Sequence, residues 1–391
     1  MPDAIDVAVV GAGPFGLSVA AHLGRLSTRT FGREMETWRT RMPYYMTLRS
    51  AWHETSLSAP GGAGTIDAWV QATVEKRREP IPLELFLRYS AWFAERFVAD
   101  RDASDVAHVE PAGTGFRVTT EAGAETDAKQ LVIAVGVTPF AAVPPELAGL
   151  FGSDATLATG NPNEPERFAG KKVLVVGGGQ AGLETAGLTA QAGGDVELVT
   201  RSTVRWFADR EPHAPRGAAG RWAYRLAYPA VGYGPPPLNR LVLHPDLFAR
   251  LPDSARGALT RRLLRSGGSP SLRPLVEGKV RLTENCTVTR AERQGEHIVV
   301  QLSDGSAREL DHVLIASGYR FDLDRLGFLA PAVRSRIAVD GGWPVLDRYF
   351  RSTDRRIFFV GYPAEGRFGP ISRFVLGVDF TANRIGGLLA A

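Results

Sequence analysis

Two glycine-rich loops, each between a strand-like and a helix-like run, constrain the fold of this chain more than any other feature. The first loop, Gly11-Ala12-Gly13-Pro14-Phe15-Gly16, follows the apolar, β-branched run Ile5–Val10 and precedes the apolar segment LSVAAHL. Such a run is typical of a buried parallel strand. A strand, a glycine-rich turn and a helix in this order form the arrangement that cradles the pyrophosphate of a dinucleotide.

The glycines of the first loop have separate roles in such a cradle. Gly11 permits the tight turn, Gly13 lets the backbone approach the pyrophosphate, and Gly16 lets the helix pack closely on the strand. The amino terminus of the helix turns its partial positive charge toward the phosphates. A glycine-rich turn without a ligand is the weaker alternative, because strand, loop and helix occur in the correct order.

The residue that usually holds the ribose is missing. An acidic residue about 20 positions further on should accept hydrogen bonds from the ribose hydroxyls. The predicted second strand, Thr28–Phe31, is followed by Gly32 and Arg33, and the nearest acids are Glu34 and Glu36. Either one of these acids reaches back, or the backbone and Arg33 hold that end of the ligand.

The same motif of strand, glycine-rich loop and helix occurs a second time in the chain. The predicted strand Val173–Val176 leads into the second loop, Gly177-Gly178-Gly179-Gln180-Ala181-Gly182, and the helical run LETAGLTAQAG. A wider repeat accompanies it. Shifted by 182 positions without a gap, Val106–Gly136 aligns with Val288–Gly318, and 8 of the 31 aligned residues are identical.

Each copy of this repeat is predicted to form a strand, a hairpin and a buried strand. The buried strands end in the small residues Ala134-Val135-Gly136 and Ala316-Ser317-Gly318, whose backbone a flat ligand can approach. Convergent composition of two hairpins is the alternative, which the gap-free register disfavours. The chain therefore holds two versions of one dinucleotide-binding unit.

Length and composition indicate a globular enzyme with two domains. The chain has 391 residues, 44% of them apolar and 23% charged, which excludes a disordered or fibrous protein. Its one cysteine, Cys286, excludes a disulfide framework, a dithiol pair, an iron–sulfur cluster and a cysteine-rich zinc site, and we expect no metal.

Charge and hydropathy limit the partners. The net charge of +4 is too small to indicate nucleic acid. No run of 18 apolar residues is present, and the start of the chain lacks the basic and apolar regions of a signal peptide. We expect a cytoplasmic protein without a membrane partner.

With these motifs in view, the chain resembles the flavoproteins with two dinucleotide-binding domains, and among them the class B flavin monooxygenases. That group includes flavin-containing monooxygenases, Baeyer–Villiger enzymes and the lysine and ornithine N-hydroxylases. The resemblance covers nearly the whole chain and rests on VVGAGPFGLSVAAHL, FGREMETWR, MTLRSAWHETSLS, KKVLVVGGGQAGLE, HVLIASGYR and IFFVGYPAEGRFGPISRFVLGVDFTANRI.

The resemblance implies an α/β fold with two Rossmann-like dinucleotide-binding domains. Residues 1–160 and 313–391 would form the FAD domain from both chain ends. Residues 161–312 would form an inserted NADPH domain, with an aromatic and basic insert at about 203–275. In such proteins the first glycine loop binds FAD and the second binds NADPH.

The resemblance also assigns residues to each cofactor. The expected FAD residues are Gly11, Gly13, Pro14, Phe15, Gly16, Arg33, Trp38, Leu48, Arg49, Val106, Ala134, Gly136, Gly361, Phe368, Gly369 and Pro370. The expected NADP residues are Gly177, Gly179, Gln180, Ala181, Gly182, Arg201, Ser202, Val288, Ala316, Ser317 and Gly318. His53 and Arg49 are the candidates for catalysis, since a histidine transfers protons near neutral pH. An ordinary surface histidine is the alternative for His53.

Arg201 and the carboxyl-terminal segment bear on how the cofactors are held. Arg201 follows the predicted strand Val196–Val199, where an arginine favours the extra phosphate of NADP and an acid favours NAD. A solvated surface arginine is the alternative. Pro370 is predicted to start a helix over Ile371–Leu389, and the resemblance implies that its amino end stabilises the anionic reduced flavin. A plain packing helix is the alternative, and both can hold.

Residues 201–281 concentrate positive charge. They carry 15 Lys or Arg against 5 Asp or Glu, a net +10, whereas the rest of the chain is −6. The aromatic residues of this segment include Trp206, Phe207, Trp222, Tyr224, Tyr228 and Tyr233. One interpretation is an excursion over the active-site cleft that binds an anionic substrate or an acidic partner protein. A solvated basic face near the NADPH phosphates is the other.

The resemblance implies an NADPH- and oxygen-dependent flavin monooxygenase. It would oxygenate a soft nucleophile of a small molecule, an amine nitrogen or a sulfur, through a flavin C4a-hydroperoxide. The cofactor carries the chemistry and the protein positions it and excludes water, so no side-chain nucleophile is needed. An FAD-dependent NADPH reductase or oxidase without oxygen transfer is the first alternative. A non-catalytic nucleotide-binding regulator is the second.

Overall fold

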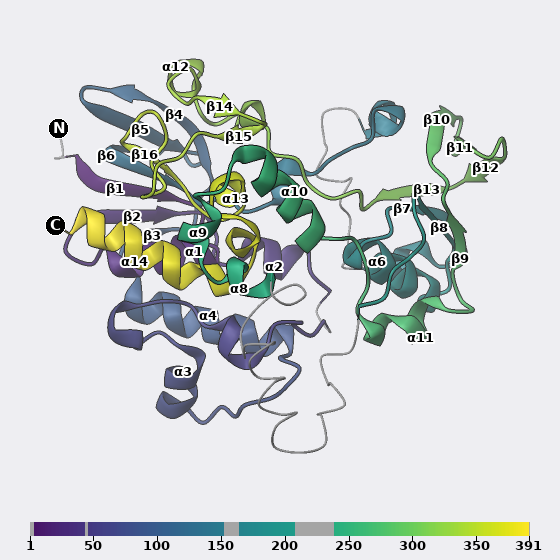
Figure 1. Cartoon of the computed structure of the whole chain (residues 1–391), viewed down its shortest axis with the longest axis horizontal. Helices are drawn as coiled ribbons and strands as arrows, with labels where there is room; N and C mark the ends of the chain where they lie inside the picture. The colour runs from purple at the N-terminus through teal and green to yellow at the C-terminus, as the bar shows by residue number, and fades with distance from the viewer. Residues whose placement is uncertain (1–3, 44–45, 152–163, 208–237, 391) are drawn as a thin grey trace.

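The structure, a computed structural model, describes residues 4–43, 46–151, 164–207 and 238–390. Two bodies lie side by side in Figure 1, one around the sheet of β1 (Ile5–Val10) and a smaller one around the sheet of β7 (Lys172–Val176). Both β1 and the last helix, α14 (Val378–Leu389), belong to the larger body. The predicted α/β architecture with two dinucleotide-binding units is confirmed.

The larger body is built on a seven-stranded sheet in the order β3-β2-β1-β6-β5-β4, with β16 also paired to β6. The other strands are β2 (Thr28–Phe31), β3 (Arg101–Asp102), β4 (Val106–Ala112), β5 (Gly115–Thr120), β6 (Glu125–Ile133) and β16 (Ile357–Phe359). β1 runs parallel to β2 and β6, while β4 and β5 form an antiparallel meander with the first half of β6. Val7, Ala8 and Val9 are completely buried, as expected for a central parallel strand.

Helices cover this sheet, and their buried side chains form a hydrophobic core with it. The helices are α1 (Pro14–His22), α2 (Glu36–Thr40), α3 (Ile66–Ala72), α4 (Leu83–Phe97), α12 (Pro331–Arg334) and α13 (Glu365–Phe368); β14 (Val339–Asp340) and β15 (Trp343–Pro344) form a small ribbon. α14 packs on α1, where a Cβ on Gly386 would lie only 2.8 Å from the Cβ of His22. Phe86, Tyr89 and Phe93 of α4 are completely buried in the same core.

The smaller body has a four-stranded parallel sheet in the order β13-β7-β8-β9 and a separate antiparallel sheet β10-β11-β12. Its further elements are β8 (Asp195–Thr200), β9 (Arg281–Glu284), β10 (Val288–Gln294), β11 (His297–Leu302), β12 (Ala307–Leu310), β13 (His312–Ile315), α5 (Ala148–Phe151), α6 (Gln180–Gln191) and α11 (Arg273–Val276). α6 follows β7 directly, and α11 packs against α6.

The predicted internal repeat is confirmed residue by residue. Val106 pairs with Thr120 in the first unit, and Val288 pairs with Leu302 in the second, which are equivalent positions after the 182-residue shift. Both ladders also change register at the equivalent point, just after their first pair. The copies differ at the closing strand, because β6 is continuous whereas its counterpart is interrupted at Asp311 into β12 and β13.

The boundaries between the units differ from those predicted. The expected return to the first unit at residue 313 falls inside β13, and β13 pairs with β7, so the second sheet continues to Ile315. Before the insertion, Leu147 is completely buried in a cluster with Leu174 and Val300 of the second unit. The segment around Leu147 therefore packs on the second unit, although it precedes the expected boundary at 160. Connecting segments carry no periodic pattern that would show which unit they cover.

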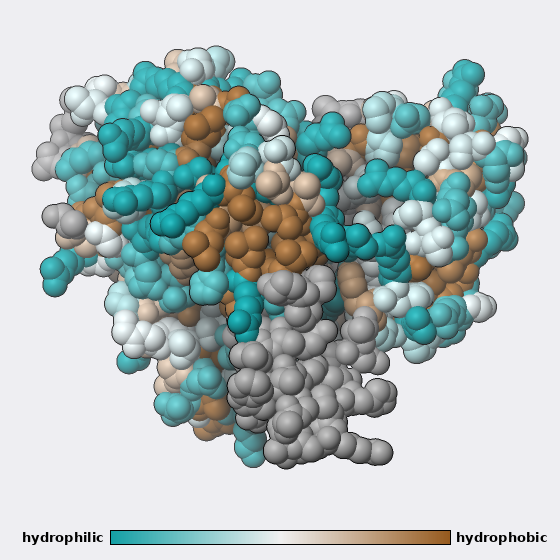
Figure 2. All heavy atoms as spheres, in the orientation of Figure 1, coloured by the Kyte–Doolittle hydropathy of each residue, from teal (hydrophilic) through white to brown (hydrophobic). Residues whose placement is uncertain are grey.

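The insert expected at about 203–275 contacts both units. Residues 208–237, with four of its seven aromatic residues, lie outside the described part of the chain. The described helices of the insert are α8 (Leu238–Val242), α9 (Pro245–Phe248) and α10 (Asp253–Leu263). Phe248 is completely buried in a cluster with Ile371 of the larger body, and Asp246 pairs with Arg384 of α14 at 2.6 Å. Figure 2 shows hydrophobic side chains gathered on this face where α9 and α13 lie.

The insert is tied to the second unit at its two ends. Trp206 and Gly268 form an isolated β-bridge, and Gly268 lies close to Leu183 of α6. Among the helices that the structure describes, none has both the length and the apolar character needed to cross a membrane.

Candidate dinucleotide sites

The first glycine loop joins β1 to α1 and lies against the end of β6. Gly11 N donates to Phe31 O of β2 at 2.9 Å, and Ala134 N donates to the last carbonyl of β1 at 2.8 Å. A Cβ on Gly11, whose φ is +110°, would lie 2.4 Å from Ala134 O. One on Gly16 would lie 1.8 Å from Gly11 O. Both glycines are required by the fold itself, because any side chain would collide with backbone.

The fold itself does not require a glycine at position 13. Its φ of −83° and ψ of −174° are open to any residue, and a Cβ there would meet no atom within 4 Å. Gly13 is the N-cap of α1, which has neither a side-chain cap nor an acid in its first turn within the described residues. Open space beside uncapped amino-terminal N–H groups is what an anion needs. The first loop therefore has room for the pyrophosphate of a dinucleotide.

The second loop repeats this geometry. A Cβ on Gly177, at φ +128°, would lie 2.3 Å from Ala316 O, and one on Gly182 would lie 1.8 Å from Gly177 O. Gly179, the uncapped N-cap of α6, has a φ of −87° and open space where its Cβ would stand. The structure thus brings the predicted NADP loop and its closing strand together, as it does for FAD.

Arg33 and Arg201 occupy equivalent positions in the two units. Each comes two residues after the carbonyl that binds its glycine loop, Phe31 O in the first unit and Val199 O in the second. The internal repeat thus provides a comparison of the two candidate ribose sites within one chain.

The surroundings of the two arginines differ in charge. Arg33 forms ion pairs with Glu36 at 2.9 Å and with Asp105 at 3.1 Å. The hydrogen bond with Glu36, and then the charge of Asp105, raise the pKa of Arg33 above its ordinary value. Arg201 and Ser202 are exposed, and no carboxylate pairs with Arg201 in the described ranges. The positive charge is neutralised in the first unit and available to a phosphate in the second.

Arg49 links the two units. Its Nη1 lies 3.3 Å from Oε1 of Gln180 at the start of α6, and its guanidinium carbon lies 4.8 Å from the centre of the Phe207 ring. Burial raises the pKa of Glu184, one turn further along α6, and the charge of Arg49 opposes that rise. Gln180 Oε1 also accepts from Ser269 N at 2.8 Å. Arg49, expected on the flavin side, therefore reaches the second glycine loop as well.

Other expected FAD residues divide into loop contacts and core packing. Gly361 lies against the first loop, since a Cβ there would be 3.3 Å from Cδ2 of Phe15. Trp38 packs on Phe86 with 5.0 Å between the ring centroids, and Leu48 is buried in the same core. The structure therefore brings Gly361 to the loop, while the side chains of Trp38 and Leu48 are engaged in packing.

His53 lies on a short 3-10 helix, η1 (Trp52–Thr55), and is exposed. The adjacent Trp52 points the other way, because it is buried and donates from Nε1 to Asp67 Oδ1 at 2.6 Å. A catalytic role for His53 stays a prediction.

The closing strands run into the segments that connect the two units. Gly136 and Gly318 both adopt a left-handed backbone, with φ of +69° and +93°. The connecting segments then pair with each other, because Ala142 N donates to Gly318 O at 2.9 Å and Ser317 Oγ donates to Ala142 O. The residues expected to close the NADP site are therefore also the residues that join the units.

The helix expected over Ile371–Leu389 is wrong in its first part. Pro370–Arg373 and Val375–Gly377 form separate 3-10 helices, and α14 begins only at Val378. The first turn of α14 carries Asp379, and a negative side chain there already neutralises the helix end. The expected stabilisation of an anionic flavin by this helix is therefore not supported by its sequence.

The segment before these turns is packed into the protein. Phe368 is buried with its ring centroid 4.1 Å from that of Phe350. Gly369, at φ +81°, is covered by Phe248 of α9, 2.8 Å from where a Cβ would stand. FAD contacts of Phe368, Gly369 and Pro370 stay predictions.

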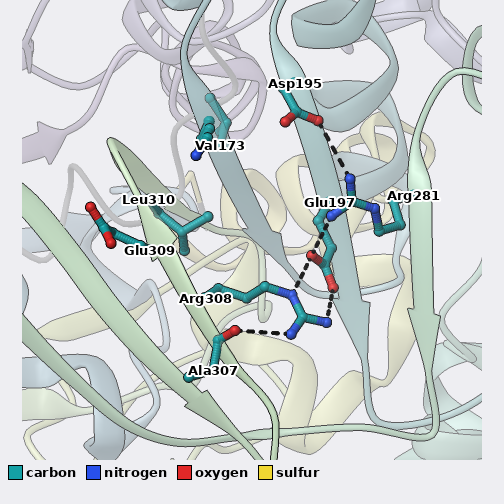
Figure 3. A pocket seen from close by; sticks show the side chains of 9 residues that line it. Val173, Asp195, Glu197, Arg281, Ala307, Arg308, Glu309 and Leu310 are labelled. Carbon is teal, nitrogen blue, oxygen red and sulfur yellow. Dashed lines mark hydrogen bonds and ion pairs between the residues drawn. The ribbon is translucent and has the colours of Figure 1, made fainter.

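A cavity of about 320 Å³ opens at the amino ends of β7 and β8, the sheet edge opposite the second glycine loop (Figure 3). Glu197 lies in it, 3% exposed, and accepts from Arg308 Nε at 2.7 Å and Nη2 at 3.0 Å. Burial alone would raise the pKa of Glu197, but hydrogen bonds from Arg308 and Thr283 outweigh it and lower the pKa. Ligands of parallel sheets bind at the carboxyl ends of strands, so we assign this cavity to a structural ion-pair network.

Sequence reasoning missed two features of the sites. Asp105 stands beside Gly32, at the rim of the first loop. The two connecting segments pair with one another through Ala142 and Gly318. Neither feature has a local motif, since each depends on residues that only the folded sheet brings together. The sequence gives one indication of this placement of Asp105, which is that an acid occurs shortly after the third strand, β3.

Three comparisons place this geometry among known proteins. Residues 8–214 match the family model described as pyridine nucleotide-disulphide oxidoreductase, which is more than half of the chain. Indole-3-pyruvate monooxygenase YUCCA1 of Oryza sativa subsp. japonica is 27% identical over 342 residues, 80% of this chain and 76% of that protein. A ferredoxin–NADP reductase of Ignicoccus hospitalis is 29% identical over 196 residues, 50% of this chain. The chain spans little more than half of that reductase, 56% of its length.

Among solved structures, the ornithine N-hydroxylase of Kutzneria sp. 744 aligns over 99% of both chains with a TM-score of 0.72 and 18% identity. At that identity the likeness shows the fold, which is the two-domain dinucleotide-binding fold of flavoproteins.

Replacing Gly13 by valine should remove FAD while leaving the fold intact. The new side chain meets no protein atom, so it should destabilise the protein by no more than a lost helix cap, about 1 kcal/mol. The FAD content of the purified protein, measured from its visible absorbance, should fall strongly. Gly16→Val is the matched control, because its Cβ would collide with Gly11 O and should destabilise the fold itself. A Gly13→Val protein with full FAD content would refute the assignment.

Proposed function

Because this chain belongs to the pyridine nucleotide-disulphide oxidoreductase family, we propose that it is an NADPH- and oxygen-dependent flavin monooxygenase. Its substrate is a small molecule with a soft nucleophile, an amine nitrogen or a sulfur. The observation that carries this proposal is the extent of the match. The monooxygenase relative aligns with 80% of the chain, and therefore with both units, whereas the reductase relative aligns with 50%.

Membership of the family makes the chain an FAD-dependent oxidoreductase that uses a pyridine nucleotide. The residues present fit both cofactors. Open space and uncapped N–H groups at Gly13 and Gly179 leave room for two pyrophosphates. We place FAD on the first loop, where Arg33 is neutralised, and NADPH on the second, where Arg201 is available.

The chain itself binds and positions the reactants. FAD, when bound, supplies hydride acceptance and oxygen chemistry, so the protein needs no nucleophile of its own. Arg201 holds the coenzyme by its phosphate. Arg49 joins the segment after α2 to Gln180 at the amino end of α6, and so connects the two units. The paired connecting segments join the two units a second time, through Ala142 and Gly318.

The family name includes disulfide reduction, but this chain lacks the pair of thiols that such a reaction uses. A dithiol reductase needs two thiols, and the sequence contains Cys286 alone. Cys286 is 4% exposed within the second unit, with Sγ 3.4 Å from Ser303 Oγ. A thiol buried in this way is poorly accessible to a disulfide substrate.

An NADPH reductase that passes electrons on without oxygen transfer is the second candidate. The match to ferredoxin–NADP reductases favours it. Such an enzyme would dock an electron acceptor, and the basic segment 201–281 is the surface predicted for an acidic partner or an anionic substrate. Part of that charge is paired within the chain, as Arg256 with Asp253 and Arg273 with Glu277. The acidic partner, the anionic substrate and the cytoplasmic location stay predictions, and a non-catalytic regulator has no supporting observation.

Oxygen use distinguishes the two candidates. The FAD-loaded protein is reduced anaerobically with NADPH, mixed with oxygen, and followed by flavin absorbance and hydrogen peroxide release. A monooxygenase should return slowly to the oxidised spectrum while NADP remains bound. With amines and thioethers supplied, it should form oxygenated product in proportion to NADPH consumed. Immediate reoxidation with stoichiometric peroxide, together with NADPH-driven reduction of ferredoxin under nitrogen, would contradict the monooxygenase.

Removing Arg201 should abolish most of the preference for NADPH. A guanidinium pairs in a forked, charge-assisted geometry with a 2′-phosphate, and such hydrogen bonds contribute roughly 1.5–3 kcal/mol. Arg201→Ala should raise the dissociation constant of NADPH about ten- to a hundredfold and leave that of NADH nearly unchanged. Equal damage to the binding of both coenzymes, measured by titration, would mean that Arg201 is an ordinary surface arginine.

The control for Arg201 is its equivalent in the other unit. Arg33 is paired with Glu36 and Asp105. Arg33→Ala should therefore leave the ratio of the NADPH and NADH dissociation constants as it is in the wild type.

A further inference from the structure

We propose that Asp105 accepts the hydroxyl hydrogen bonds of the adenosine ribose of FAD, the role for which the sequence offers no acid at position 32. The proposal rests on the placement of FAD on the first glycine loop. It assigns a binding residue from the segment after β3, outside the motif that forms the loop.

The backbone at position 32 explains why the acid is not there. Gly32 has a φ of +104°, a conformation that residues with a side chain rarely adopt. This conformation is held in place, because Gly32 N donates to Asp102 O of β3 at 2.8 Å. An acid at position 32 would therefore be strained, so a carboxylate that binds the ribose would come from another segment.

The two nearest acids in the sequence face other partners. Glu34 Oε1 accepts from Ser90 Oγ at 2.9 Å and from Arg39 Nη2 at 3.1 Å. Glu36 Oε2 lies 2.9 Å from Nε of Arg33. Neither acid is placed to reach back to the loop without giving up these interactions.

The carboxylate of Asp105 lies next to the position that a side chain at residue 32 would occupy. Its Oδ1 lies 3.7 Å from the position of a Cβ on Gly32. The same position lies 3.8 Å from Ala12 N and from Gly11 Cα, which places it at the rim of the first loop. Oδ2 of Asp105 is 3.1 Å from Arg33 Nη2. One oxygen is thus held by Arg33, and the other lies beside Gly32, which is next to the loop.

The second unit supports this assignment by contrast. After the 182-residue shift, the equivalent of Asp105 is Thr287. The equivalent of Gly32 is Thr200, because each directly follows the carbonyl that binds its glycine loop, Phe31 O or Val199 O. Neither is acidic. A carboxylate would accept from ribose hydroxyls but repel a 2′-phosphate. The position of Asp105 is therefore acidic only in the unit assigned to FAD. The acid next to Thr200 in the second sheet, Glu284, accepts from Val204 N at 2.8 Å.

The test compares the binding of FAD with that of an analogue whose adenosine ribose lacks both hydroxyls. The FAD dissociation constant is measured from the flavin fluorescence released when the holoprotein is diluted, and the analogue is measured by competition. Asp105→Asn should weaken FAD binding about ten- to a hundredfold, as expected for a lost hydrogen bond to a charged group. Wild type should lose about as much with the analogue, and Asp105→Asn should hardly distinguish the two ligands.

Asp100→Asn is the matched control. Asp100 lies in the same segment and pairs with Arg29 at 2.9 Å, so the change removes an ion pair of similar exposure away from the loop. This variant should bind FAD as the wild type does and keep the discrimination against the analogue.

The failure of this proposal differs from the failure of the proposed function. Wild type that binds FAD and its analogue equally, or Asp105→Asn that still discriminates between them, would overturn the role of Asp105 alone. Asp105→Asn with weakened binding but full discrimination would show that Asp105 only supports the fold of the loop, which also overturns it. Wild-type protein that binds no FAD would overturn both.

Discussion

Each glycine loop presses its backbone against the carbonyl at the end of its closing strand, and the rest of the structure depends on this contact. A Cβ on Gly11 would lie 2.4 Å from Ala134 O, and one on Gly177 would lie 2.3 Å from Ala316 O. This approach positions the amino end of the following helix over the carboxyl ends of the strands, where parallel sheets bind ligands. Because the closing strands continue into the paired connecting segments, the same contact also determines where the two units join.

The two units have the same backbone arrangement, but their candidate sites differ in charge. Arg33 and Arg201 follow equivalent strand residues, but Glu36 and Asp105 neutralise the first and no described carboxylate pairs with the second. Charge-assisted hydrogen bonds differ by a few kcal/mol with and without a phosphate partner, which is enough to sort two dinucleotides between two similar cradles. We therefore propose that the glycine motif holds the pyrophosphate in each unit and that side chains outside the motif determine which dinucleotide binds.

The two units and their loops could be predicted because short-range rules determine them. Strand, glycine turn and helix are adjacent in sequence, and the gap-free repeat from Val106 and from Val288 keeps its register because hairpins are local. The features that were missed depend on packing between distant segments. Leu147 joins the second core, and the segment after Gly369 forms short turns beneath Phe248 and not the expected helix. Asp105 belongs to this second group, since only the order of strands in the sheet brings it to Gly32.

Amide hydrogen exchange tests the central claim most directly, because it reports on each loop separately. The protein is compared without ligand, with FAD, and with FAD and NADP. FAD should protect the amides around Gly13 at the start of α1, and NADP should add protection around Gly179 at the start of α6. Protection of the second loop by FAD, or the absence of any added protection there by NADP, would contradict the assignment of two cofactors to two copies of one unit.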